Sequence, residues 1–151
     1  MNMKKKSNQT PPNLPRELRE RLITLGKEIH ALIVARKFDE AERLCRQGLE
    51  LIPNPSDAYI ETAWYCSGLG EIYFLRGEFS QARELYERAR LILEKYGESD
   101  PYTLLRLGEA ALETGDEASA LRNMLGAYKA EGWEIFEGHS KKYCEFLKNN
   151  I

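Results

Sequence analysis

Few side chains in this sequence are of types that could carry chemistry, and their spacing does not bring them together. The two histidines, His30 and His139, lie far apart in the chain, and a lone histidine without a placed partner specifies no reaction. Zinc sites are usually marked by paired ligands at short spacing, whereas His139 and Cys144 lie five residues apart with no second pair near them. We therefore predict no metal site and no bound cofactor.

Acidic residues offer the next possibility for catalysis. Glu109 and Glu113 are one helical turn apart and so share a helix face, where they are either a pair of catalytic acids or a solvated charged face. The sequence contains neither a Gly-rich phosphate loop of the Walker type nor a Gly-x-Ser-x-Gly nucleophile turn. The sequence thus predicts that the protein is not an enzyme.

The cysteines and the apolar runs bear on location. Cys45, Cys66 and Cys144 are odd in number and widely spaced, which is typical of reduced thiols in a cytoplasmic protein. Lys4 to Lys6 are followed by polar residues and prolines, unlike a secretory signal. The longest apolar run, residues 31–35, is far shorter than the ~20 residues of a membrane span. We expect a cytoplasmic protein that does not bind a membrane.

Charge separates the beginning of the chain from the rest. Residues 1–14 contain three lysines, two prolines and few apolar residues, which predicts a flexible basic tail. They hold three of the 22 basic residues and no acidic ones, so residues 15–151 carry 19 basic against 24 acidic side chains. Binding to nucleic acid needs concentrated positive charge, and we predict none.

From residue 15 onward, apolar residues recur every three or four positions, which is the period of an α-helix. Six such stripes follow one another, and Ser140 opens a shorter seventh. Asp100 and Pro101 mark a helix start, because aspartate accepts a hydrogen bond there and proline needs no donor. Turn residues separate several of the stripes, at Pro53, Gly77, Gly97 and Gly115. No segment alternates with a period of two, so the predicted fold class is all-α.

The helices also form an internal repeat. An alanine early in each second helix recurs as Ala41, Ala82 and Ala120, at spacings of 41 and 38 residues. The last two copies share further positions, namely Leu69-Gly70 with Leu107-Gly108 and the turn residues Gly77 with Gly115. The first copy departs from this pattern, with Glu28-Ile29 in place of Leu-Gly and Arg36 in place of the turn glycine.

These positions resemble the tetratricopeptide repeat. The resemblance implies an α-α superhelix, a solenoid with repeats at about 18–53, 56–97 and 100–132 and a capping helix within segment 133–151, all in one domain of residues 15–151. Helices approach closely where small residues face each other, so we expect Gly70, Ala82 and Ala89 at such crossings.

In the resembling family, the first helix of each pair lines a concave groove that holds a peptide or helix of a partner. Carried over by alignment, the partner-binding residues are Trp64, Glu71, Phe74, Tyr102, Leu105, Glu109 and Leu112, with His30, Ile33 and Ser67 beside them. Apolar residues mixed with carboxylates suit a partner that is part hydrophobic and part basic. The alternatives are that Trp64 and Phe74 pack inside the protein and that Glu71 and Glu109 are merely solvated.

One departure from the family concerns its chaperone-binding members, which clamp a C-terminal carboxylate with lysine and asparagine. Here Ser67, Leu105, Glu71 and Glu109 occupy the equivalent positions, and carboxylates repel a carboxylate. We predict that this clamp is absent.

The function that this implies is a non-catalytic module that binds another protein. The alternative is a homo-oligomeric structural protein, for instance a homodimer, that associates through its own apolar surface. Trp133 and Phe136 fit either view, because they belong to no clean helix stripe. They either cover the end of the last repeat or mediate self-association.

Overall fold

The computed structural model describes residues 9–151, and this part of the chain contains α-helices and short 3-10 helices but no strand. The α-helices are α1 (Arg16–Val34), α2 (Phe38–Leu51), α3 (Ile60–Leu75), α4 (Phe79–Lys95), α5 (Pro101–Glu113), α6 (Glu117–Glu131) and α7 (Lys141–Asn149). The 3-10 helices are η1 (Ser56–Ala58) and η2 (Trp133–Phe136). The predicted all-α class is confirmed.

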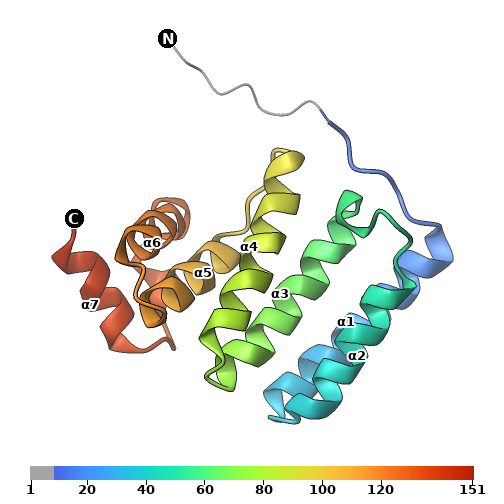
Figure 1. The fold of residues 1–151 in the computed structure, drawn as a ribbon, viewed down its shortest axis with the longest axis horizontal. Coiled ribbons are helices and arrows are strands. Elements are labelled where there is room, and N and C mark those ends of the chain that lie inside the picture. Colours follow the sequence, from blue (N-terminus) through green and yellow to red (C-terminus); the bar gives the residue numbers. More distant parts are fainter. Residues whose placement is uncertain (1–8) are drawn as a thin grey trace.

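The helices pack as consecutive pairs, α1 with α2, α3 with α4 and α5 with α6. Figure 1 shows these pairs following one another along the long axis of the molecule, from α1 and α2 at one end to α6 and α7 at the other. Each pair also contacts the next one along the chain. This is the arrangement of a helical solenoid, in which neighbouring pairs together bury apolar faces that one pair alone would expose.

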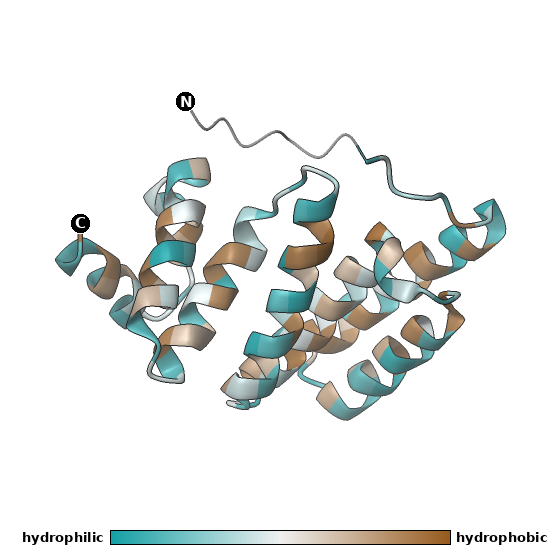
Figure 2. Ribbon diagram, turned by 45° about the horizontal axis from the view of Figure 1, so that its top comes forward, coloured by the Kyte–Doolittle hydropathy of each residue, from teal (hydrophilic) through white to brown (hydrophobic). Residues whose placement is uncertain are grey.

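Apolar residues share each helix with polar ones, and Figure 2 shows both colours along the same ribbons. The apolar sides meet in a cluster around Tyr65 and Leu69 in the first half of the chain and in another around Tyr86 and Met124 in the second half. The predicted tail overlaps the first cluster, because Leu14 is buried there. Residues 1–8 of that predicted tail lie outside the described residues.

Small residues lie where the helices cross, as the repeat pattern predicts. A Cβ atom added to Gly70 would lie 3.0 Å from the ring of Tyr86, and one added to Gly108 would lie 2.7 Å from Met124. In the first repeat, Gly48 faces the Tyr65 ring, and the corresponding distance is only 2.1 Å. Ala82 and Ala89 are completely buried. The crossings therefore leave no room for larger side chains.

The turn inside each pair has the same backbone hydrogen bond in all three repeats. It runs from Lys37 N to Leu32 O (2.8 Å), from Glu78 N to Tyr73 O (2.8 Å) and from Asp116 N to Ala111 O (2.9 Å). The residue before each donor has a positive φ, 79° at Gly77, 86° at Gly115 and 59° at Arg36. The first repeat thus keeps the left-handed turn that its sequence, with arginine in place of glycine, had obscured.

Local signals at the helix ends act as predicted. Asp100 caps α5 by accepting a hydrogen bond from Thr103 N (3.2 Å), with Pro101 in the first turn. Asp116 caps α6 through Ser119 N (3.1 Å). Gly97 follows α4 with a φ of 71°.

Candidate functional site

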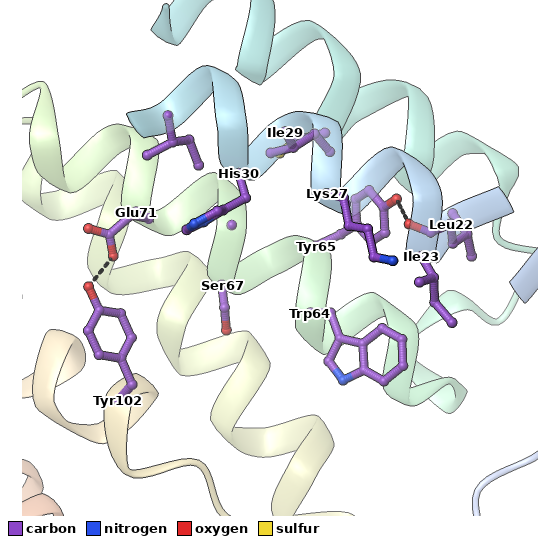
Figure 3. Close-up of a pocket in the computed structure, with 14 residues that line it drawn as sticks. Leu22, Ile23, Lys27, Ile29, His30, Trp64, Tyr65, Ser67, Glu71 and Tyr102 are labelled. Carbon is purple, nitrogen blue, oxygen red and sulfur yellow. Dashed lines mark hydrogen bonds between the residues drawn. The ribbon is translucent and has the colours of Figure 1, made fainter. Parts of the chain in front are cut away.

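A groove of about 770 Å³ lies between the first helices of the repeats. One wall is α1, the floor and opposite wall come from α3, and Tyr102 at the start of α5 closes one end (Figure 3). Its surface is mainly apolar, and the lining residues are Leu22, Ile23, Gly26, Lys27, Ile29, His30, Ile33, Cys45, Trp64, Tyr65, Ser67, Gly68, Glu71 and Tyr102. A volume of this size lies within the ~300–1,000 Å³ of ordinary ligand pockets.

Three of the predicted partner-binding residues line this groove. Trp64 is 42% exposed and Tyr102 is 40% exposed, so both present ring surface to the solvent. Glu71 lies on α3 at the far end of the groove from Trp64, where it accepts a hydrogen bond from the Tyr102 hydroxyl (Figure 3). His30 and Ile33, expected beside them, also line the groove. Whether these residues bind a partner stays a prediction, but they are accessible and lie around one opening.

The other predicted residues lie in the core instead. Leu105 and Glu109 are both 0% exposed, so neither side chain can reach a partner in this structure. Phe74 is buried, and Leu112 packs against the core cluster of the second half. The alignment placed all four on the groove-facing side of their helices, but the protein's own residues cover that side from Phe74 onward.

The residues that cover it come from α4 and from the C-terminal segment. The Phe74 ring meets Phe79 at 5.1 Å and Tyr143 of α7 at 6.4 Å between ring centroids. Glu113 accepts a hydrogen bond from the Tyr143 hydroxyl (2.7 Å) and pairs with Lys142. The helix predicted to cap the solenoid packs against α6 and η2, and its Tyr143 side chain reaches Glu113 at the end of α5 and Phe74 near the end of α3. The groove remains open only in its N-terminal part.

A chain of charged side chains links the open and covered parts. Glu71 accepts hydrogen bonds from Arg106 (2.7 Å) and from the hydroxyls of Tyr86 and Tyr102 (2.8 Å each). Arg106 also donates to Glu109 (3.0 Å). Burial raises the pKa of Glu71, but the bonds from Arg106 and the tyrosines outweigh it, and the pKa lies below its usual value. Glu71 is therefore held as a carboxylate whose charge is already compensated.

His139 completes this chain at its buried end. Its Nδ1 lies 2.7 Å from Oε2 of Glu109, and its ring packs edge-on against Tyr102 at 5.9 Å. Both predicted carboxylates of the groove, Glu71 and Glu109, are thus occupied inside the protein. The expectation of a partly basic partner rested on these carboxylates, so it loses its support.

Sequence reasoning missed most of the wall formed by α1. Ile23, Gly26 and Lys27 line the groove, but the first repeat lacks the Leu-Gly pair that would have aligned them. A signal was present nevertheless. Ile23, Lys27 and His30 have the i, i+4, i+7 spacing of one helix face, beside the buried stripe of Leu22 and Ile29.

Two of the three cysteines, Cys45 and Cys66, are buried in the core. Burial raises the pKa of Cys45 to about 12 and that of Cys66 to about 11, so neither thiol ionises at neutral pH. Residues 9–151 contain no group of three or more His, Cys, Asp or Glu side chains that could hold a metal ion together. Among the same residues, no helix is both long and apolar enough to cross a membrane.

The turns, crossings and pairing described above match a known repeat in sequence as well. The family model of the tetratricopeptide repeat matches residues 21–95 and 59–129. The chain belongs to the tetratricopeptide-repeat family. Repeats of this family are in general protein–protein interaction modules, and the first repeat, which the sequence pattern made look degenerate, lies within the match.

Known structures agree on the fold of this tetratricopeptide-repeat protein. It is similar to the N-terminal domain of stress-induced protein-1 (STI-1) from C. elegans, with a TM-score of 0.63 and 17% identity, covering 87% of this chain and 98% of that domain. At this identity the likeness concerns the fold alone. No curated protein matches the sequence.

Proposed function

We propose that this tetratricopeptide-repeat protein is a non-catalytic interaction module that binds a peptide or helix of another protein in the groove between α1 and α3. The observation that carries the proposal is the open apolar groove with Trp64 exposed on its wall. Large aromatic side chains on an accessible, mainly apolar surface are typical of residues that dominate binding energy at protein interfaces.

The dimensions of the groove support a segment rather than a whole domain as the occupant. A space of about 770 Å³ accommodates a few side chains of one chain segment. The C-terminal segment covers the rest of the concave face, so a bound segment would contact the first repeat and the first helix of the second. A cytoplasmic location, inferred from the cysteines, remains part of this proposal.

The groove offers a simple blocking variant with a matched control. Gly26 lines the groove, and a Cβ atom added to it meets no atom within 4 Å. Gly26→Trp therefore places an indole in the groove without a clash in the core, while Gly26→Ala adds only a methyl group. Both replacements have higher helix propensity than glycine, so α1 should remain intact.

The test is capture from native cell extract with three baits, the wild type, Gly26→Ala and Gly26→Trp. A protein that the first two retain and Gly26→Trp loses would then be purified and titrated against all three by calorimetry. Direct binding that only Gly26→Trp abolishes supports the proposal. If every captured protein binds Gly26→Trp as well as the wild type, the groove is not the binding site.

Self-association is the second candidate function, and exposed apolar residues away from the groove are the observation that favours it. Leu91 on α4 and Val34 at the end of α1 are both largely exposed. Sedimentation of the wild type decides this point, because a stable oligomer has a mass above the 17.4 kDa of one chain that persists on dilution.

A further inference from the structure

The charged residues of the groove differ in whether they already have a partner inside the protein. Glu71 is fully engaged by Arg106, Tyr86 and Tyr102. Lys27 and His30 are exposed, and neither makes an ion pair or a hydrogen bond from its side chain within the described chain. The side chains that remain available to a bound segment are therefore basic ones.

These two residues lie on the same side of one helix. Ile23, Lys27 and His30 are spaced by four and three residues, so they form one face of α1 that lines the groove opposite Trp64 (Figure 3). Arg19, one turn before Ile23, lies over the Trp64 ring at 5.6 Å and pairs with the buried Glu61. The α1 wall thus offers basic groups beside apolar surface, and no free carboxylate lines it.

We propose that the groove selects a protein segment that combines apolar side chains with one or more side-chain carboxylates, the apolar groups against Trp64 and Ile23 and the carboxylates near Lys27 and His30. This inference rests on the proposed function, since it names the class of partner for the same groove. Charge complementarity supports this inference, because a basic segment in the groove would place like charges together and leave the Lys27 ammonium without a counter-charge.

The first step of the test selects short random peptides displayed on phage with the wild-type protein, and counter-selects them with Gly26→Trp. Selected peptides are then synthesised with acetylated and amidated ends, so that their only carboxylates are side chains. We expect enrichment of Asp and Glu next to aromatic or aliphatic residues. Replacing those acids by lysine should weaken binding to the wild type by about tenfold or more.

The second step replaces the basic side chains of the α1 wall by acidic ones. The double variant Lys27→Glu, His30→Glu should bind the acidic peptides at least about tenfold more weakly and should prefer their lysine counterparts. Lys129→Glu, an exposed residue of α6 outside the groove, is the matched control and should bind like the wild type. Circular dichroism of each variant verifies that the helices are intact.

The outcomes separate this inference from the function on which it rests. Peptides that need an open groove but show no enrichment in acids, or that bind the reversed variant equally well, overturn the acidic preference and leave the interaction function in place. If no peptide distinguishes the wild type from Gly26→Trp, both proposals fail. A dimer that Gly26→Trp dissociates would identify a second copy of the chain as the occupant, which also overturns this inference.

Discussion

Arg106 and Glu71, 35 residues apart in the sequence, form an ion pair of 2.7 Å between the first helices of the second and third repeats. Both side chains are largely buried, and the Arg106 guanidinium also lies 4.1 Å from the centroid of the Phe74 ring. This pair marks the boundary between the open groove and the part covered by the C-terminal segment. It therefore compensates the charge of Glu71 on the groove wall and links the two repeats to each other.

Removing the arginine should expose this role. Arg106→Met keeps apolar cover over Phe74 but leaves the buried carboxylate of Glu71 without its cation, which we expect to destabilise the fold by about 3 kcal/mol. Chemical denaturation measures the change. The double variant Arg106→Met, Glu71→Gln should recover part of the loss, because the carboxylate of Glu71 is then neutral while Glu109 keeps its contact with His139. Equal stability of the single variant and the wild type would show that the pair contributes little.

Stability at low pH should depend on Glu42 of α2. Hydrogen bonds from Tyr73 and Arg76 lower the pKa of Glu42 from 4.5 to about 2. A carboxyl group whose pKa is lower in the folded state stabilises the fold above its unfolded pKa, and this contribution is lost as the pH falls from about 4.5 to about 2.

The measurement is the urea midpoint from neutral pH down to about pH 2 for the wild type and Glu42→Gln. The variant should be less stable at neutral pH, and the difference should shrink in the acidic window. Glu50→Gln, an exposed residue of the same helix, should follow the wild-type profile. Parallel curves for the wild type and Glu42→Gln would refute the assignment of this pH dependence to Glu42.

The left-handed turns make a prediction about glycine. Gly77 and Arg36 occupy equivalent turn positions with positive φ, so alanine at either position should be less stable than glycine by about 1 kcal/mol. Thermal melts of Gly77→Ala against the wild type, and of Arg36→Gly against Arg36→Ala, give the two differences. Gly26→Ala in the helix interior should show the opposite sign, because alanine favours a regular helix. If Arg36→Ala were more stable than Arg36→Gly, as expected inside a regular helix, the turn would not be left-handed at position 36.

Tight crossing of α3 and α4 should make Ala82 intolerant of larger residues. Ala82 is completely buried, and Gly70 on α3 lies against the Tyr86 ring of the same helix pair. Ala82→Leu should cost ~1–3 kcal/mol, because the core cannot take the extra volume without moving α4 away from α3. Ala130→Leu on exposed α6 surface is the control and should leave the melting temperature nearly unchanged. An unchanged midpoint for Ala82→Leu would contradict the close packing.

Much of the fold could be predicted because its signals are local. Apolar spacing fixed the faces of the helices, and the caps at Asp100 and Asp116 act within three residues of themselves. The groove could be predicted only in part. Trp64, Glu71 and Tyr102 line it as expected, whereas Leu105 and Glu109 lie in the core. The alignment located the correct helix faces but could not tell which of them another part of the chain covers.

The sequence by itself determined the helices and the turns at Gly77 and Gly115, since these depend on residues only a few positions apart, and the recurring alanines at spacings of 41 and 38 residues indicated how the helices pair into repeats. The tertiary structure alone decided which carboxylates are available and where the groove ends. Glu109 meets His139 and Glu113 meets Tyr143, each 30 residues away. Such contacts depend on how the C-terminal segment packs back across α5, and packing between distant segments has no periodicity that a sequence pattern could reveal.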